Sequence, residues 1–168
     1  RQRQAEHAQL RRMLSAIGHR GPEGAAFSRG DRGALMLGFL QLGFTDGGVC
    51  LQPMSDDAGL HTLAFNGEIY DHAALRTKLQ AHGHRFRTAS DTEVLLHLYL
   101  EEGKRCFDRL NGEFAFAIWD ADAQALTLVR DRFGVKPLFY AWHRGAFVFA
   151  SEAMGILALE GFPAELNP

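Results

Sequence analysis

Phe114-Ala115-Phe116-Ala117-Ile118-Trp119 is an unbroken run of apolar residues in the second half of the chain. Because such a run is apolar at every position instead of alternating, it predicts a strand that is buried on both faces or lies under helices. Similar segments rich in aromatic and branched residues follow it, separated by turn residues, at 125–130, 137–142 and 146–150. This spacing predicts a series of strands in the second half of the chain, with the same burial on both faces or under helices.

Helical signals dominate the first two thirds of the sequence. Leu10, Met13, Leu14 and Ile17 recur at helical spacing, which predicts a helix over 5–17. Capping-box spacing at 90–93 predicts a second helix that ends at Gly103. The other expected elements are strands at 24–28, 34–44 and 60–65, a helix at 71–81 with Asp71 as its cap, a helical turn at 106–110 and a closing helix at 151–159. The pattern predicts an α+β protein with helices covering sheets.

Length and composition restrict the possible classes of protein. The 168 residues correspond to one ordinary domain, and 46% hydrophobic residues are enough for a core. Lys and Arg (18) nearly balance Asp and Glu (20), which argues against a nucleic-acid or membrane-surface partner. The sequence has neither a long apolar run nor an apolar leader, so the expected compartment is the cytoplasm.

Asn66-Gly67-Glu68-Ile69-Tyr70 places an amide side chain, an unhindered backbone N–H and a carboxylate at the end of a predicted buried strand. This combination suits acyl transfer, because Asn66 and the Gly67 N–H could donate to an oxyanion while Glu68 binds a cationic group. The alternative is an Asn-Gly turn of a β-hairpin, which is the more frequent meaning of this dipeptide. The residues alone leave both interpretations open.

Two further polar stretches have a structural interpretation beside a functional one. Asp91 in the first turn of a helix is explained by the helix dipole, although it could also hold the amino group of a ligand. The segment 130–137 is interpreted as a charged turn pinned by ion pairs, which contribute only about 0 to 1 kcal/mol when exposed. His82-Gly83-His84 lacks a third ligand nearby and is interpreted as a surface turn, so no metal site is predicted.

The cysteines do not form a recognisable catalytic or metal-binding pattern. Cys50 follows a Gly-Gly loop and Cys106 lies in an apolar helical turn, and both are expected to be inert. The sequence also lacks a Gly-x-Ser-x-Gly elbow, a phosphate-binding glycine loop and a His-Glu-x-x-His pair. It therefore predicts neither a nucleotide-binding nor a metal-dependent activity for this domain.

Taken in order, the motifs resemble the N-terminal glutaminase domain of the asparagine synthetase family, a group of class II glutamine amidotransferases. The motifs that carry the resemblance are His19-Arg20-Gly21-Pro22, Gln52-Pro53-Met54, Asn66-Gly67-Glu68-Ile69-Tyr70, Ser90-Asp91-Thr92-Glu93, the segments 110–120 and 130–137, and Phe149-Ala150-Ser151-Glu152. The resemblance implies an N-terminal-nucleophile fold, a four-layer αββα sandwich with mainly antiparallel sheets. It also implies one glutaminase-type domain over 1–168, without its first strand.

In that family, the domain hydrolyses glutamine to glutamate and ammonia for amide synthesis. The resemblance implies that Asn66 and Gly67 form the oxyanion hole and that Glu68 and Asp91 bind the amino group of the substrate. The nucleophile of the family is a terminal Cys, whose own amino group can act as the base. The domain itself needs no cofactor, whereas ATP and Mg belong to the synthetase domain of the parent enzyme.

This sequence departs from the family at two points. It begins at Arg1, and the internal Cys50 and Cys106 have amide nitrogens that cannot act as bases, so no nucleophile is expected in the chain as written. Gln41 stands where the family has an Arg that binds the substrate carboxylate, and a neutral amide cannot make that charge-assisted contact. Glutaminase activity is therefore expected to be impaired, with the terminal Cys either truncated or lost.

Two partners follow from the resemblance, and one alternative function remains. The expected partners are glutamine, or a vestigial empty pocket in its place, and a C-terminal synthetase domain, with a homodimer possible. The alternative is a non-catalytic scaffold or interaction domain of an amide-bond or ring-forming synthetase, of the β-lactam synthetase type.

Overall fold

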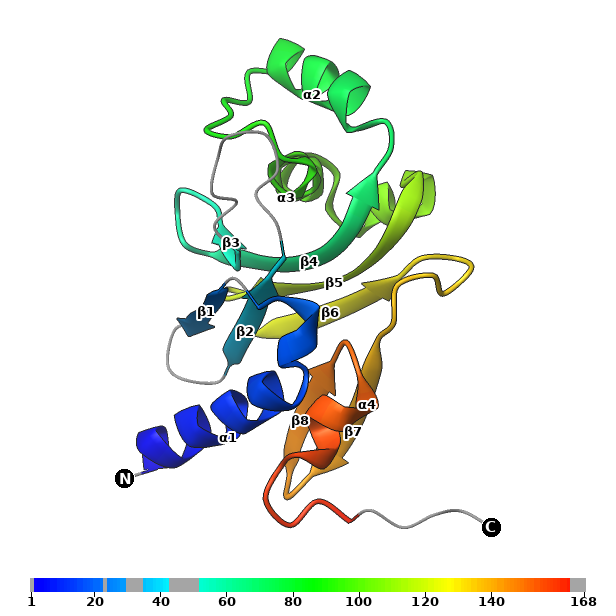
Figure 1. Ribbon diagram of the computed structural model, residues 1–168. Coiled ribbons are helices and arrows are strands. Elements are labelled where there is room, and N and C mark those ends of the chain that lie inside the picture. The colour runs from blue at the N-terminus through cyan, green and yellow to red at the C-terminus, as the bar shows by residue number, and fades with distance from the viewer. Residues whose placement is uncertain (1, 23, 30–34, 43–51, 164–168) are drawn as a thin grey trace. The chain divides into compact units, whose positions relative to one another are not determined.

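The computed structural model describes residues 2–22, 24–29, 35–42 and 52–163. The backbone forms two compact units, one made of Arg1–Gly43 with Pro137–Pro168 and the other of Phe44–Lys136. Each unit is described by itself (Figure 1). The prediction of a single domain over 1–168 stays a prediction.

The unit Phe44–Lys136 contains a four-stranded antiparallel sheet in the order β3-β4-β5-β6 (Figure 1). Its strands are β3 (Met54–Ser55), β4 (His61–Ile69), β5 (Gly112–Asp120) and β6 (Ala125–Arg130). Two α-helices, α2 (His72–Ala81) and α3 (Asp91–Glu102), and the 3-10 helix η3 (Gly103–Arg109) connect β4 to β5. The predicted helices and strands of this region are therefore present, with β4 longer than expected.

The core of this unit lies between one face of the sheet and α3. Alternate residues of β4 and β5 point to this face, as the two-residue period of a strand requires. Side chains from the sheet and from α3 pack together in it: Leu63, Phe65, Ile69, Phe114, Phe116 and Ile118 with Val94, Leu95, Leu98 and Tyr99. All six residues from Phe114 to Trp119 are buried, as predicted for an unbroken apolar run.

The described residues of the other unit form two hairpins and two α-helices. The hairpins are β1 (Gly24–Arg29) with β2 (Met36–Gln41), and β7 (Phe139–His143) with β8 (Ala146–Ala150). The helices are α1 (Gln2–Ala16), followed by the 3-10 turn η1 (Gly18–Arg20), and α4 (Ala153–Leu157). Helix α1 follows its predicted span closely, whereas the closing helix is shorter than the predicted 151–159.

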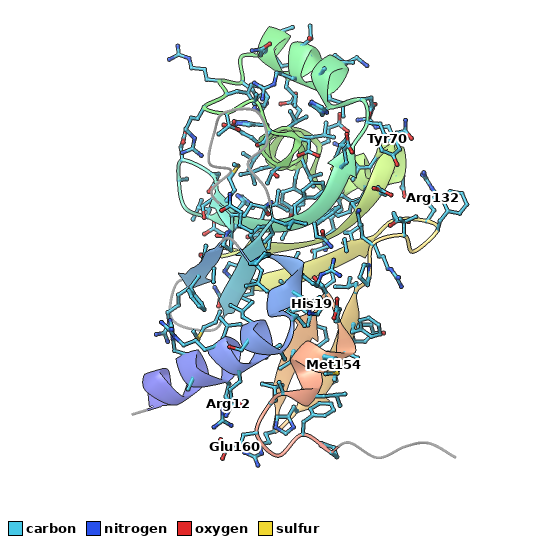
Figure 2. The ribbon with its side chains drawn as sticks, in the orientation of Figure 1. Arg12, His19, Tyr70, Arg132, Met154 and Glu160 are labelled. Carbon is cyan, nitrogen blue, oxygen red and sulfur yellow. The ribbon has the colours of Figure 1, made fainter. Side chains whose placement is uncertain are left out.

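A small apolar cluster and two ion pairs hold α1 and η1 near α4. Met13 packs with Ile156 and Leu159, and the inner face of the β7-β8 hairpin lies against this cluster. Arg12 contacts Glu160 at 3.0 Å (Figure 2), and Arg20 contacts Glu152 at 2.9 Å. The N-terminal helix is thus bound to the C-terminal segment of the same unit.

Three sequence predictions about local structure need correction. Asp71 occupies the N-cap position of α2, but its side chain caps no backbone N–H there. The turn after β6 is not pinned mainly by ion pairs, because four backbone N–H groups donate to the Asp131 carboxylate. The strands β7 and β8 are not buried on both faces, since Tyr140 and Trp142 of β7 and Phe147 of β8 are exposed.

Cys106 is fully buried, and burial raises the pKa of its thiol to about 12. This agrees with the prediction of an inert residue, because the reactive thiolate form is suppressed at neutral pH. Cys50 lies outside the described residues. No helix in the described ranges has the length and apolar character needed to span a bilayer.

Candidate functional site

Asn66, Gly67 and Glu68 lie inside β4 and not in a turn. They pair with Ala115, Phe114 and Glu113 of β5 in antiparallel register. The hairpin-turn interpretation of Asn66-Gly67 is therefore wrong, because the strand continues through both residues to Ile69. This pairing gives the amide, the glycine and the carboxylate fixed directions.

Gly67 is required by the close approach of β5. A Cβ atom at this position would lie 2.1 Å from the Glu113 carbonyl oxygen and 2.6 Å from the Phe114 Cα. Both neighbours are backbone atoms, so they cannot move aside as a flexible side chain could. Only a residue without a side chain fits here without separating the strands.

The outer edge of β4 presents a row of backbone N–H groups. The Phe65 N–H donates to Gln52 Oε1 at 2.6 Å, and the Ile69 N–H donates to Asp91 Oδ2 at 3.0 Å. Antiparallel pairing directs alternate N–H groups of a strand to the same side. The Gly67 N–H therefore points to this edge between the other two, and no described side chain accepts a hydrogen bond from it. The Gly67 N–H is thus a donor that lies between two N–H groups whose acceptors are side chains.

The Asn66 side chain provides a second unused donor beside Gly67. Its Nδ2 is buried and has no hydrogen-bond partner among the described residues. Leaving a buried amide nitrogen unpaired costs about 1–3 kcal/mol, so such a group calls for an explanation. Asn66 lies on the face of the sheet opposite the core, where its cross-strand partner is Ala115 and the adjacent pair is Ala64 with Ala117. The neighbours of Asn66 on this face of β4 and β5 are therefore small.

Asp91 is brought to the same edge by the start of α3. Burial raises the pKa of its carboxyl, the N–H groups of Ile69 and Thr92 lower it, and the charge of Glu68 raises it further. The net effect is a raised pKa, so the ionised form is not fully compensated within the protein. A carboxylate in this state gains from a cationic ligand.

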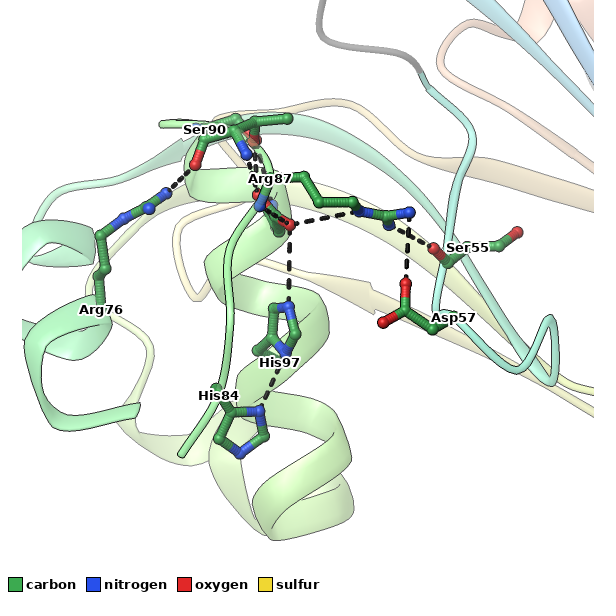
Figure 3. Close-up of polar contacts among 9 residues, drawn as sticks. Ser55, Asp57, Arg76, His84, Arg87, Ser90 and His97 are labelled. Carbon is green, nitrogen blue, oxygen red and sulfur yellow. Dashed lines mark hydrogen bonds and ion pairs between the residues drawn. The ribbon is translucent and has the colours of Figure 1, made fainter. Parts of the chain in front are cut away.

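A buried network fixes the segment that carries Asp91. Ser90 caps α3 by accepting the Glu93 N–H at 3.2 Å. Glu93 does not complete the predicted capping box but accepts the N–H groups of Arg87 and Thr88 at 2.8 and 2.7 Å. Figure 3 shows Arg87 and His97 directed toward this buried carboxylate. Burial by itself would raise the pKa of Glu93, but these hydrogen bonds lower it overall. The approach to Asp91 is therefore rigid.

Glu68 differs from its neighbours because it is exposed. It lies on the same face of β4 as Asn66, and Glu113 is directly opposite it on β5. Glu113 forms an ion pair with Lys136 at 3.1 Å. Asn66, Gly67 and Glu68 therefore lie next to one another in β4, and Asp91 contacts Ile69 at the end of the same strand.

The remaining predicted residue belongs to the other unit. Gln41 is the last residue of β2 and pairs with Gly24 of β1.

The surface turn predicted at His82-Gly83-His84 follows α2, where His84 contacts Glu101 and His97. Within the part of the chain that the structure describes, no group of three His, Cys, Asp or Glu side chains could hold a metal ion.

Sequence reasoning assigned no role in the site to Gln52. Its side chain is buried and joins the edge of β4 to α3, because Oε1 accepts from Phe65 N–H while Nε2 contacts Thr92 Oγ1 at 3.4 Å. The Gln52-Pro53-Met54 motif marks this residue in the sequence. The motif does not reveal which backbone N–H group the Gln52 side chain accepts a hydrogen bond from.

Comparison with known proteins identifies the family of this chain. The family described as "Glutamine amidotransferase domain" matches residues 1–168. The chain belongs to this family. It is 39% identical over 164 residues to "Asparagine synthetase [glutamine-hydrolyzing] 3" of Bacillus subtilis (strain 168), covering 96% of this chain and 26% of that protein. It is 36% identical to "Asparagine synthetase B [glutamine-hydrolyzing]" of Escherichia coli (strain K12), covering 87% of this chain and 27% of that protein.

A solved structure extends the comparison to the fold. The glutamine phosphoribosylpyrophosphate amidotransferase of B. subtilis, complexed with ADP and GMP, matches with a TM-score of 0.71 and 26% identity. The match covers 87% of this chain and 39% of that one. This chain therefore has the predicted α+β N-terminal-nucleophile fold, and its amidotransferase domain is of the asparagine synthetase type. It spans about a quarter of the length of the asparagine synthetases that it matches.

Proposed function

We propose that the chain is the glutamine site of an asparagine-synthetase-like, ATP-dependent amide-forming enzyme, and that its glutaminase activity is impaired. The observation that carries the assignment of the site is the pair of unused donors at Asn66 and Gly67, flanked by the carboxylates of Glu68 and Asp91. ATP and Mg would act elsewhere in the longer enzyme, in a synthetase domain.

The two donors suit the chemistry of carboxamide hydrolysis. Attack on the side-chain carbonyl of glutamine converts its oxygen to an oxyanion, which needs hydrogen-bond donors already in position. Asn66 Nδ2 and the Gly67 N–H are adjacent in sequence and neither is consumed by a described side chain. Removal of one such donor typically lowers the rate by roughly 10² to 10³.

The carboxylates suit the other end of the substrate. The Asp91 carboxylate accepts a hydrogen bond from the Ile69 N–H, and Ile69 is two residues from Gly67. Two residues span about 7 Å along a strand. This span is comparable to the distance between the side-chain carbonyl and the amino group of an extended glutamine. Glu68 and Asp91 would bind that amino group, while the carbonyl lies at Asn66 and Gly67.

Cys106 cannot supply the nucleophile, because its thiol is fully buried and its pKa is raised to about 12 by burial. In the family that this chain resembles, the nucleophile is a terminal Cys. The described residues therefore bind the substrate and stabilise the oxyanion, and the attacking group comes from outside this set.

Gln41 is the reason for proposing impaired activity. The side chain is neutral, so it cannot form the bidentate, charge-assisted contact with a carboxylate that an Arg makes. Hydrogen bonds to charged groups contribute about 1.5–3 kcal/mol, which corresponds to roughly 10- to 150-fold in affinity.

The test is glutamate release from glutamine by the native full-length protein and its Gln41→Arg variant. We expect little release from the wild type and an increase of about tenfold or more in the variant. Gln80→Arg is the matched control, since it adds the same charge on the exposed surface of α2. Rapid release by the wild type, with no gain from Gln41→Arg, would contradict the proposed impairment.

The neutral side chain of Gln41 also favours a second candidate function, that of a non-catalytic scaffold of an amide-bond or ring-forming synthetase. A vestigial pocket would bind glutamine neither in the wild type nor in Gln41→Arg. Binding of glutamine by either protein excludes this alternative.

A further inference from the structure

Glu68 and Glu113 are directly opposite each other on β4 and β5. Cβ atoms in such pairs are about 4.5–5.5 Å apart, and like charges in this position are destabilising. Both side chains point to the face of the sheet that carries Asn66. The pair therefore concentrates negative charge at the proposed amino-group site.

Lys136 compensates only one member of this pair. Its Nζ is 3.1 Å from Glu113 Oε1, and the two side chains are about 30% exposed, at 28% and 31%. Glu68 forms no ion pair with any residue of the described range 52–163. One lysine thus neutralises Glu113 and leaves the charge of Glu68 available.

The backbone of the turn after β6 determines where Lys136 lies. The Lys136 N–H donates to Asp131 Oδ2 at 3.0 Å, and its carbonyl accepts from Arg130 Nε at 2.7 Å. Asp131 itself is buried and accepts three further backbone N–H groups. Lys136 is therefore projected toward Glu113 from a rigid turn.

From these contacts we propose that the Lys136–Glu113 ion pair controls how strongly Glu68 attracts the amino group of the substrate, so that both residues are positioning residues for the glutamine site. This inference rests on the proposed function. The pair holds the lysine away from Glu68. If Glu113 lost its charge, Lys136 would turn to Glu68 and compete with the substrate ammonium. If Lys136 lost its charge, Glu113 would add its own attraction for that ammonium.

The two substitutions therefore have opposite expected effects. Glu113→Gln should weaken the binding of L-glutamine to the full-length protein, and Lys136→Met should strengthen it. For partly exposed charges we expect a change of about two- to fivefold in Kd in each case. The double variant Glu113→Gln/Lys136→Met should return close to the wild-type affinity. A general loss of stability cannot produce changes of opposite sign.

Calorimetric titration of these four proteins with L-glutamine and with its analogue lacking the amino group tests the proposal. All four carry Gln41→Arg if the wild-type affinity is too low to measure. The analogue should bind the four proteins with affinities within about twofold of each other. Lys104→Met, which removes an exposed charge on η3, is the matched control and should behave as wild type. In a Glu68→Gln background, the effect of Glu113→Gln should disappear, whereas Lys136→Met should still strengthen binding, because Glu113 attracts the ammonium directly.

Changes in the same direction for both single variants, or equal changes for the analogue, would overturn the inference. If no protein binds glutamine, the proposed function fails, and the ion pair is then judged by the crystal structure of Glu113→Gln. Lys136 Nζ within about 4 Å of the Glu68 carboxylate would support the competing contact, and Lys136 directed into solvent would exclude it.

Discussion

Asp131 and Phe114 form a reciprocal pair at the end of β6: the Asp131 N–H donates to the Phe114 carbonyl at 2.8 Å, and the Phe114 N–H donates to Asp131 Oδ2 at 3.2 Å. A side chain thus continues the ladder where the strand ends. Three more N–H groups from the following turn, those of Phe133, Val135 and Lys136, complete the shell of this carboxylate.

Asp131→Asn should destabilise the protein clearly. Burial by itself raises the pKa of Asp131, but the four N–H donors lower it to about 2. An amide cannot replace the carboxylate, because its NH2 group would face donors. The wild-type contribution is present above pH about 3.8 and is lost as the pH falls toward 2, since the folded pKa is the lower one. Urea denaturation at pH 7 measures the loss, and Asp122→Asn, an exposed site, is the control. Equal midpoints for the two variants would refute the role given to Asp131.

Asp91→Asn should separate binding from stability. The folded-state pKa of Asp91 is raised, so its ionised form reduces stability as the pH rises through that pKa. At pH 7 the amide variant should therefore melt at the wild-type temperature or slightly above it, while the new amide oxygen still accepts from the Ile69 N–H. Glutamine affinity should fall by roughly 10-fold or more, because a charge-assisted contact is lost. Thermal melting and ligand titration on the same samples check both statements, and a variant that melts earlier and binds normally would contradict them.

Gly67→Ala should be strongly destabilising. The added methyl group would lie 2.1 Å from the Glu113 carbonyl oxygen, so β4 and β5 would have to separate. Overpacking of this kind costs about 1–3 kcal/mol and occasionally more. Gly83→Ala is a matched control, because Gly83 also has a positive φ but no atom within 4 Å of the position that its added methyl group would take. Denaturant midpoints should fall much further for Gly67→Ala, and similar midpoints would show that the close approach is not tight.

The His84–His97 contact predicts weaker stability in mild acid. Their Nδ1 atoms are 2.9 Å apart, so one ring donates to the other (Figure 3). Burial lowers the pKa of His97, and so does the charge of His84, although Glu93 and Asp57 oppose this. A lowered folded-state pKa means that stability falls as the pH drops below about 6.5, the unfolded value.

Melting temperatures between pH 7.5 and 5.0 should fall for the wild type. His97→Gln should show a flatter profile over this interval, because the titrating ring is gone. His143→Gln, in the other unit, serves as the control. An unchanged slope in His97→Gln would assign the acid sensitivity to other groups.

Local patterns predicted most of the secondary structure. The helix at 90–103 begins at a serine cap and ends at Gly103, both readable from the sequence. The run 114–119 is a buried strand, as its apolar character at every position predicts. These features depend on neighbours within one turn or one strand, so the sequence contains them directly.

The site required information that the sequence does not show locally. Asn66-Gly67 has the form of a hairpin turn, and only its pairing with β5, more than forty residues later, makes it part of a strand. Asp131 was assigned to ion pairs because its real partners are backbone N–H groups, which are present at every residue and therefore give no signal. The role of Gln52 depends on a partner 13 residues away.

Amide NMR of the protein during titration with L-glutamine tests the location of the site most directly. In the Gln41→Arg variant, we expect the Gly67 backbone N–H and the Asn66 side-chain amide to shift with one shared Kd, and Asp91→Asn to weaken that Kd by roughly 10-fold or more. Binding of glutamine that leaves both of these signals unchanged and shifts others elsewhere would contradict the account.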